Sequence, residues 1–319
     1  MGEGENNKSG QGPSDEDATE VNTTPQQSNN GDNALPTAVT GFDKARAMAA
    51  TASQETGRLL NKRFVLEGSL GQGGMGAVYQ ARDLRKVEAE DSNPYIAVKV
   101  LAGNFKAHPQ AFVTLQQEAV KTQALAHPNI VTVYDFDRED DTVFITMELL
   151  KGDPLDNLLV LEAPFSLEIC LRYFRELCAG LEYAHKRGLI HSDFKPANIF
   201  VTAGGTVKIL DFGIARAASQ EQAKGQFDAG VLGALTPPYA TVEMINGESP
   251  GFEDDVYPLA CVMYEMLTGR HPYGKVSAAE AQDKKLKVEK PPSLSSVQWL
   301  ALSKGLQLER DKRCATVES

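Results

Sequence analysis

The 319-residue sequence has few cysteines, no long apolar run and no excess of positive charge. Its four cysteines, Cys170, Cys178, Cys261 and Cys314, are widely separated and none forms the CxxC pair of a metal or redox site, so we expect reduced thiols in a cytoplasmic protein. No stretch reaches the ~18 consecutive apolar residues of a membrane span, and the amino terminus lacks a signal peptide's basic and apolar regions. A formal net charge of −11 disfavours nonspecific binding to nucleic acid or acidic membranes and favours basic proteins or peptides as partners.

The composition predicts an unfolded tail followed by a globular part. Residues 1–40 contain seven acids and one base among Asn, Gln, Ser, Gly and Pro, and such a segment buries too little apolar surface to offset its ordering entropy. Residues 41–62 are richer in Ala, Lys, Arg and Gln and predict a linker or a short helix. The remaining 63–319 are the predicted folded domain, and 42% apolar residues overall suffice for a sizeable core.

Residues 63–149 have the pattern of a small β-rich lobe with one main helix. Short apolar runs at 64–66, 77–79 and 96–98 alternate with polar breaks, which predicts antiparallel strands, and the polar run 86–93 predicts a hairpin loop. Residues 110–125 predict a helix with Phe112, Leu115 and Ala119 on its apolar face. Two further strands are expected at 130–136 and 143–148.

Residues 152–319 are predominantly helical in pattern. Ser166 is the expected cap of a helix that continues through Ala184. Asp254 or Asp255 is the expected cap of a second helix over 256–267, which ends before Gly269, and Pro258 would lie in its first turn. The overall prediction is an α+β protein with a larger, mostly α carboxyl-terminal lobe.

The most informative stretch is His191-Ser192-Asp193-Phe194-Lys195-Pro196-Ala197-Asn198, followed by Asp211-Phe212-Gly213. Asp193 can accept a hydroxyl proton, Lys195 can neutralise a phosphate, and Asn198 and Asp211 can hold magnesium. Asp193 alone could be a turn-forming aspartate, but four residues at this spacing match the needs of phosphoryl transfer together. His191 is expected to be structural, because no second histidine or cysteine lies at metal-ligand spacing from it.

Two amino-terminal features fit the same chemistry. Gly71, Gly73 and Gly76 form a GxGxxG pattern between strand-like runs, which favours a glycine-rich hairpin over a dinucleotide-binding turn that opens a helix. Lys99 ends the run 96–98; a lone strand lysine is usually solvated, but Glu118 on the next predicted helix could pair with it. A lysine held in that way can bind the α- and β-phosphates of a nucleotide.

In these motifs and their order, residues 63–319 resemble a eukaryotic-type (Hanks-type) serine/threonine protein kinase of the kind found in bacteria. The resemblance implies a two-lobed protein-kinase-like fold, ATP and Mg²⁺ as cofactors, and protein substrates with serine or threonine acceptors. Asp193 would be the catalytic base, Lys195 would contact the γ-phosphate, and Asn198 and Asp211 would ligate magnesium. Thr236 would lie against the catalytic loop near the acceptor.

The resemblance also implies a nucleotide site. Met147 would be the gatekeeper, and Glu148 and Leu150 would give backbone contacts to adenine. Val78, Ala97 and Phe200 would enclose the ring, while Gly71, Gly73, Gly76, Lys99 and Glu118 would serve the phosphates.

The sequence departs from the family pattern at several positions. Ser192 replaces the arginine that pairs with an activation-segment phosphate, and Ser219 is the only hydroxyl residue between Gly213 and Thr236, so we hypothesise that activity does not depend on phosphorylation there. Thr241-Val242-Glu243 replaces the usual Ala-Pro-Glu, and Glu243 would pair with Arg313. Thr122 stands where the family's regulatory hydrophobic stack has an apolar residue. The sequence also ends at Ser319, before the expected end of the family's last helix, which suggests a truncated domain.

Two alternatives remain at this stage. A pseudokinase that binds partners without catalysis would be consistent with Ser192, Thr122 and the altered Thr241-Val242. A small-molecule kinase similar to the aminoglycoside phosphotransferases shares a similar catalytic loop, but those relatives generally lack the glycine loop and the segment around Thr236.

Overall fold

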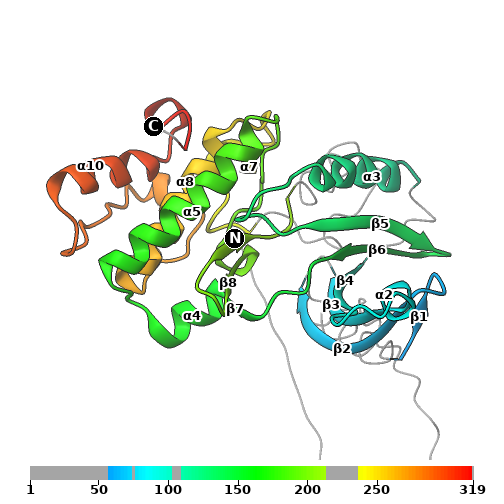
Figure 1. The fold of residues 1–319 in the computed structure, drawn as a ribbon. Helices are drawn as coiled ribbons and strands as arrows, with labels where there is room; N and C mark the ends of the chain where they lie inside the picture. The colour runs from blue at the N-terminus through cyan, green and yellow to red at the C-terminus, as the bar shows by residue number, and fades with distance from the viewer. Residues whose placement is uncertain (1–56, 74–75, 103–108, 213–235, 318–319) are drawn as a thin grey trace, which may run out of the picture. The chain divides into compact units, whose positions relative to one another are not determined.

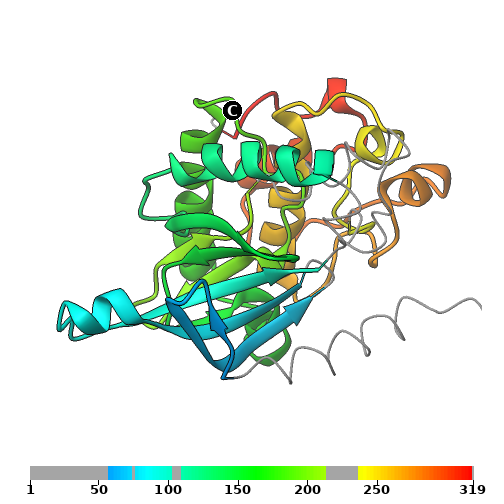
Figure 2. The same ribbon diagram turned by 90° about the vertical axis from the view of Figure 1, so that its right-hand side faces the viewer.

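The structure, a computed structural model, describes residues 57–73, 76–102, 109–212 and 236–317. Figures 1 and 2 show a curved β-sheet with helix α3 beside it, and a region of packed helices that contains the carboxyl-terminal end. This α+β architecture of a β-rich and a helical part confirms the predicted fold class. The predicted tail and most of the predicted linker lie outside the described residues.

The β-rich part is built on antiparallel strands. Among the described residues one sheet has six strands in the order β1-β2-β3-β4-β6-β5. Their bounds are Leu59–Leu60 (β1), Phe64–Gly73 (β2), Gly76–Asp83 (β3), Tyr95–Leu101 (β4), Val133–Glu139 (β5) and Thr142–Met147 (β6). One face buries Leu66, Tyr79, Val98 and Phe144, and the other buries Ala97, Ile145 and Met147. β-branched and aromatic residues at alternate positions account for both faces.

Two local features of this part were not predicted. Leu59 and Leu60 pair with Val65 and Phe64 in β1, so the predicted linker or helix ends in a strand there, because pairing with the edge of β2 buries Leu60 completely. The predicted loop 86–93 contains the end of a short helix, α2 (Leu84–Glu88). The Asp83 carboxylate caps it by accepting from Arg85 N, a local signal that the sequence analysis overlooked.

Helix α3 (Pro109–Gln123) is the predicted main helix of the β-rich part and lies alongside β5 in Figure 1. Leu115 and Ala119 are buried on its inner face, one turn apart, and Phe112 packs against the ring of Phe136 with centroids 5.6 Å apart. The helical spacing of apolar residues predicted this contact face correctly.

The helical part contains short strands and longer helices. Their bounds are Gly152–Pro154 (β7), Leu155–Glu162 (α4), Leu167–His185 (α5), Pro196–Asn198 (η1), Ile199–Thr202 (β8), Val207–Ile209 (β9), Val242–Ile245 (α7), Glu253–Thr268 (α8), Ala278–Asp283 (α9), Ser296–Gly305 (α10) and Arg310–Lys312 (η2). Ser166 caps α5 by accepting from Ile169 N, as predicted. The buried side of α5, with Cys170, Leu177 and Leu181, packs against α8.

The start of α8 differs from the prediction. The helix begins at Glu253, so Asp254 and Asp255 lie in its first turn rather than at its cap, and Pro258 lies in its second turn. Both carboxylates are engaged by distant segments instead: Asp254 by Thr241 and Arg310, and Asp255 by residues near His191. Gly269 ends the helix in a left-handed conformation with φ 69°, as its position predicted.

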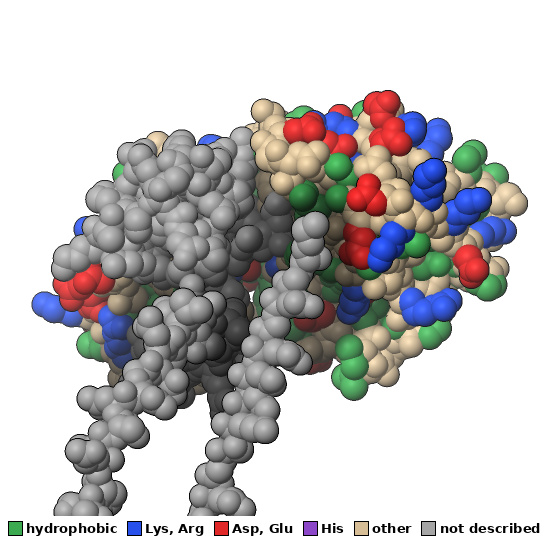
Figure 3. All heavy atoms as spheres, turned by 180° about the vertical axis from the view of Figure 1, so that it is seen from behind, with side chains coloured by type: hydrophobic (Ala, Val, Ile, Leu, Met, Phe, Trp, Pro, Cys, Tyr) green, Lys and Arg blue, Asp and Glu red, His purple; other side chains and the backbone are tan. Residues whose placement is uncertain are grey.

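The structure can be compared with the predictions made from composition, which concern the cysteines, membrane spans and charge. The four cysteines are free, and within the described residues no helix is long and apolar enough to cross a membrane. On the coloured part of the face in Figure 3, basic and acidic side chains are interspersed. The preference for basic partners therefore stays a prediction from net charge.

Candidate active site

The backbone of the loop that carries Asp193 is held by one buried carboxylate, that of Asp255. Asp255 on α8 accepts from His191 N at 2.8 Å, from Ser192 N at 3.0 Å and from His185 Nε2 at 2.8 Å. These bonds hold Ser192 at φ 65°, a left-handed conformation that is uncommon for a residue with a side chain. The sequence analysis named Asp255 only as a possible cap, and its three donors explain how it can be fully buried.

His191 is a core residue, as expected. Its side chain is completely buried, its Nε2 lies 2.7 Å from Leu210 O, and its Nδ1 accepts from Asp193 N at 3.3 Å. The ring packs between Phe194 and Phe212, with centroids 5.5 and 4.7 Å away. His191 therefore ties the loop of Asp193 to the segment of Asp211.

Three side chains meet at the Asp193 carboxylate. Lys195 Nζ lies 2.6 Å from Oδ2, Asn198 Nδ2 donates to the same oxygen at 3.2 Å and to Asp193 O at 2.8 Å, and Thr236 Oγ1 donates to Oδ1 at 3.2 Å. Lys195 also donates to Thr236 Oγ1 at 2.7 Å. The structure thus brings together the loop residues that the sequence predicted, with Thr236 from 41 residues beyond Lys195.

Lys99 reaches the same region from the β-sheet, but its partner differs from the one predicted. Its Nζ lies 2.6 Å from Asp211 Oδ2, whereas Glu118 pairs with Lys121 at 2.5 Å. Glu118 has a cation three residues along its own helix, and Lys99 extends from the central strand β4 toward Asp211. The predicted Lys99–Glu118 pair is therefore absent from the described residues.

The glycine-rich pattern forms a hairpin, as predicted, because β2 and β3 pair with Gly73 opposite Gly76. Gly76 has φ 138°, and a β-carbon there would lie 2.0 Å from Val100 O, so only glycine fits this position. Gly71 lies opposite Val78 and is exposed. Gly74 and Met75, at the turn, lie outside the described residues.

The predicted adenine contacts lie mostly in one apolar cluster. Ala97 pairs with Met147 across β4 and β6, and Val78 and Leu150 pack against the same buried group, together with Leu210, which the sequence analysis did not name. Phe200 lies on β8, outside this cluster, opposite Pro154 and Lys208. The Glu148 side chain accepts from Thr132 N and Lys208 Nζ, at 2.8 and 2.6 Å. Because Glu148 N donates to Thr132 O at 3.0 Å, the backbone group that could face a base is its carbonyl.

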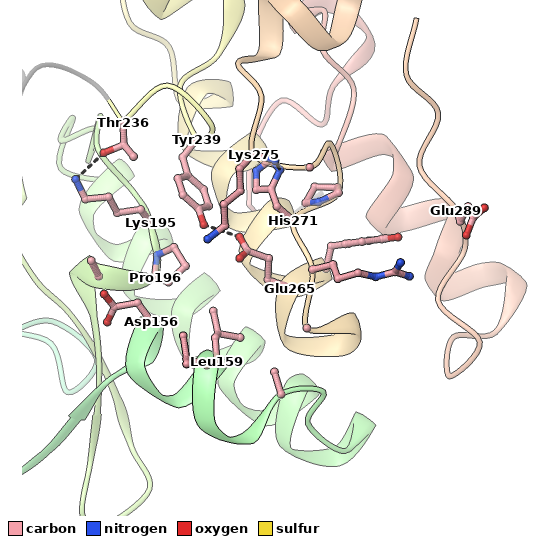
Figure 4. Close-up of a pocket in the computed structure, with 18 of the residues that line it drawn as sticks. Asp156, Leu159, Lys195, Pro196, Thr236, Tyr239, Glu265, His271, Lys275 and Glu289 are labelled. Atoms are coloured by element: carbon pink, nitrogen blue, oxygen red, sulfur yellow. Dashed lines mark hydrogen bonds between the residues drawn. The ribbon is translucent and has the colours of Figure 1, made fainter. Parts of the chain in front are cut away.

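A cavity of about 1070 Å³ adjoins the Asp193 loop (Figure 4). Lys195 and Thr236 lie at one end, and Tyr239 and Glu265 lie along it, joined by a 2.6 Å hydrogen bond from the tyrosine hydroxyl. Burial raises the pKa of Glu265, although the bond from Tyr239 opposes the shift. The cavity is large enough to take an extended peptide segment next to the carboxylate of Asp193.

The chain is similar to a known protein family and to bacterial relatives within it. The family model described as "Protein kinase domain" matches residues 64–318. "Serine/threonine-protein kinase PknB" of Mycobacterium tuberculosis is 37% identical over 218 residues, which are 67% of this chain and 34% of that protein. "Probable serine/threonine-protein kinase PknB" of Bifidobacterium longum is 32% identical over 273 residues, 81% of this chain and 38% of that protein. The chain thus spans about a third of the length of these curated relatives.

Proposed function

The chain belongs to the protein kinase domain family, and from this premise we propose that it transfers the γ-phosphate of ATP to serine or threonine hydroxyls of proteins. The observation that carries the proposal is the convergence at one place of Asp193, Lys195 and Asn198 with Lys99 and Asp211. A carboxylate base, two lysines and two oxygen ligands are the side chains that phosphoryl transfer requires.

Asp193 is positioned to act as the base. Its side chain is 4% exposed, and Thr236 Oγ1 already donates to Oδ1, so a substrate hydroxyl could donate at the same oxygen. In the proposed reaction the acceptor oxygen attacks the γ-phosphorus as its proton passes to Asp193, and ADP leaves. Lys195 stabilises charge on the transferred group, because its ammonium lies beside the same carboxylate.

The side chains fit a magnesium ion. Among the described residues Asn198 forms its two side-chain hydrogen bonds through Nδ2, which leaves its amide oxygen available, and Asp211 uses Oδ2 for Lys99, which leaves Oδ1. Magnesium favours oxygen ligands and is typically held by one or two carboxylates together with substrate phosphates. Consistent with that, the described residues contain no cluster of three or more His, Cys, Asp or Glu that could hold a metal alone. A bound Mg²⁺ would neutralise phosphate charge at this place.

The proposed acceptors are serine and threonine in proteins. Lys195, two places after Asp193, is the residue found in serine/threonine kinases, and the relatives named above are serine/threonine kinases. The cavity next to Lys195 has room for a peptide rather than for a small metabolite alone. Both features support protein substrates.

We further propose that activity does not require a phosphate on the activation segment. In the structure the buried Ser192 Oγ has no hydrogen-bond partner among the described residues, and the Ser192 backbone is held by Asp255. A serine offers no positive charge to a phosphate, so the loop depends on Asp255 for its shape. Ser219, the hydroxyl available in that segment, lies outside the described residues.

Incubation with labelled ATP, Mg²⁺ and a basic acceptor protein, followed by phosphosite mapping, tests the proposal. We expect phosphoserine or phosphothreonine from the natural sequence and a loss of at least about 10²-fold in rate in Asp193→Asn, with nucleotide binding retained. Asp283→Asn, an exposed change on α9, is the matched control. Nucleotide binding without any transfer would favour the pseudokinase alternative, and full activity in Asp193→Asn would refute the role of this carboxylate.

A further inference from the structure

Thr122 is a buried hydroxyl residue in the last turns of α3, with 5% of its surface exposed. Its Oγ1 lies 3.0 Å from Glu118 O, one turn earlier in the same helix. It also lies 3.2 Å from Phe212 O, in a segment 90 residues further along the chain. Thr122 therefore connects α3 to the residues directly beside Asp211.

The second contact is the unusual one. A helical threonine ordinarily bonds to the carbonyl four residues before it, which satisfies its hydroxyl within the helix. A hydroxyl carries a single proton, so the proton of Thr122 is shared between Glu118 O and Phe212 O. Phe212 O belongs to no helix or strand, and Thr122 is the partner that the described residues provide for it.

The bond from Thr122 to Phe212 O lies in mostly apolar surroundings, which increases its contribution to the stability of this segment. A small cavity of about 20 Å³ separates α3 from the sheet, and its wall is apolar at Val131, Ile145 and Met147. Thr122 and Asp211 supply the polar side chains of that wall. A carbonyl left unpaired in such a place is costly, and a hydrogen bond there is stronger than in water.

Asp211 also has a conformation that needs support. Its φ is 58°, in the left-handed region, which a residue with a side chain keeps only when its neighbours hold it there. On one side the carboxylate is held by Lys99, and before it Leu210 N bonds to Asn198 O at 2.9 Å. On the other side, after Asp211, the Phe212 ring packs against His191, and the hydrogen bond to the backbone is the one from Thr122 to Phe212 O.

We propose that Thr122 is a positioning residue: its hydroxyl holds the Phe212 carbonyl so that Asp211 stays against Lys99 with a free oxygen for the metal. The proposal rests on the role proposed above for Asp211. In this structure Glu118 is paired with Lys121 and does not connect α3 to the site. Under the proposal, Thr122 makes that connection. A threonine at this position thus replaces an apolar contact with a directional bond.

The test compares Thr122→Val, which keeps the shape and removes the hydroxyl, with Thr122→Ser, which keeps the hydroxyl. Thr146→Val is the matched control, because Thr146 is also buried in the β-rich part and its hydroxyl bonds to Asp135 O on the neighbouring strand β5. Amide hydrogen exchange without nucleotide or metal reads the Asp211–Phe212 segment directly. Turnover against Mg²⁺ and against acceptor protein reads the consequence.

In Thr122→Val we expect amide exchange at Asp211–Phe212 to rise about fivefold, kcat to fall about fivefold, and half-saturation by Mg²⁺ to shift upward by a similar factor, with KM for the acceptor protein unchanged. Thr122→Ser and Thr146→Val should match the natural sequence in all four measurements. Unchanged exchange and Mg²⁺ dependence in Thr122→Val, or an equal defect in Thr122→Ser, would overturn the proposal. If the natural sequence transfers no phosphate, the proposed function fails, and the exchange measurement still decides whether Thr122 holds this segment.

Discussion

Lys99 and Arg313 are both buried cations that reach a carboxylate far away in the sequence, but they are satisfied to very different extents. The Arg313 guanidinium donates to Gln307 O, Glu253 O and Leu308 O, each at 3.0 Å, and to Glu243 Oε2 at 3.3 Å. For Lys99, the acceptor among the described residues is Asp211 Oδ2. An ammonium has three hydrogens, of which Lys99 uses one here, so Lys99 keeps donors for a ligand. Of the five N–H groups of Arg313 four are bonded, and its Nη1 also lies 3.5 Å from Asp254 Oδ1.

The difference separates a cation that holds the fold from one that is available for chemistry. Around Arg313, burial opposes ionisation of Glu243, but backbone hydrogen bonds and the guanidinium outweigh it and keep the pKa of that carboxyl below its usual value. Asp254 lies 3.5 Å from the same guanidinium and has further partners in Thr241 and Gly251. In the helical part the buried charges form a closed network, whereas at the site they stay incomplete.

Removing the saturated cation should have the largest effect. Arg313→Met leaves Glu243 buried without the guanidinium that contacts it and removes one of the two cations beside Asp254, so we expect a loss of roughly 3–5 kcal/mol in the free energy of unfolding. Chemical denaturation followed by circular dichroism measures it. Lys312→Met, at an exposed pair with Glu309, should leave the free energy of unfolding nearly unchanged, because solvent screens such a pair. Equal stabilities of the two variants would contradict the contrast between the two cations.

Removing the unsaturated cation should affect turnover rather than stability. Lys99→Met takes away the ammonium proposed to bind nucleotide phosphates, and we expect the rate of phosphate transfer to fall by about 10²- to 10³-fold, with a small change in melting temperature. Lys284→Met, at an exposed pair on α9, is the control for loss of a lysine charge. If Lys99→Met lost stability but kept the natural rate of phosphate transfer, Lys99 would be a cation that stabilises the fold rather than one that binds nucleotide.

His271 extends the comparison to a neutral group in the helical part. Burial lowers its pKa to about 4, against a weaker opposing effect of the bond to Pro238 O, and its Nδ1 accepts from Tyr273 N and Lys275 N. The unfolded chain binds this proton more tightly, so stability falls as the pH drops from about 6.5 toward 4, by about 2 kcal/mol at pH 5. Denaturation of the natural sequence and of His271→Gln at pH 7.5 and 5 measures it. The same pH dependence in both would exclude His271 as its source.

The smallest effect is expected at Ser219. Because Ser192 replaces the arginine that would bind an activation-segment phosphate, Ser219→Ala should leave the rate of phosphate transfer within about twofold of the natural value. The assay uses the same acceptor protein with phosphosite mapping of the chain itself. A large loss of rate would show that the site needs a phosphate despite Ser192, and would weaken the view that the loop relies on Asp255.

Features carried by short stretches of sequence were predictable. The residues at 193, 195 and 198 lie on one loop, so their spacing along the chain is close to their spacing in space, and the structure brings them together. Helix α5 with its Ser166 cap and the hairpin of β2 and β3 follow from local patterns in the same way. The Glu243–Arg313 pair, expected from the family, is confirmed at 3.3 Å.

Partners across long sequence separations were not predictable from the residues alone. The sequence analysis offered Glu118 as the partner of Lys99, whereas the structure gives Asp211, and the outcome depends on where α3 sits against the sheet. Asp254 and Asp255 had the pattern of helix caps, but their carboxylate oxygens accept hydrogen bonds from distant residues instead of capping the helix. Thr122 carried no signal of its bond to Phe212 O, because hydrogen bonding between remote segments leaves no periodicity in the sequence.

The order of residues along the chain was enough to indicate the family, the α+β class and the chemistry of the Asp193 loop, since each depends on neighbours a few positions apart. The folded arrangement was needed to learn which buried charges are saturated and which are left with free donors. That outcome depends on how segments as far apart as 112 residues pack against each other. In a buried environment an unpaired polar atom is costly, so the partners that packing brings within hydrogen-bonding distance determine which charges are satisfied.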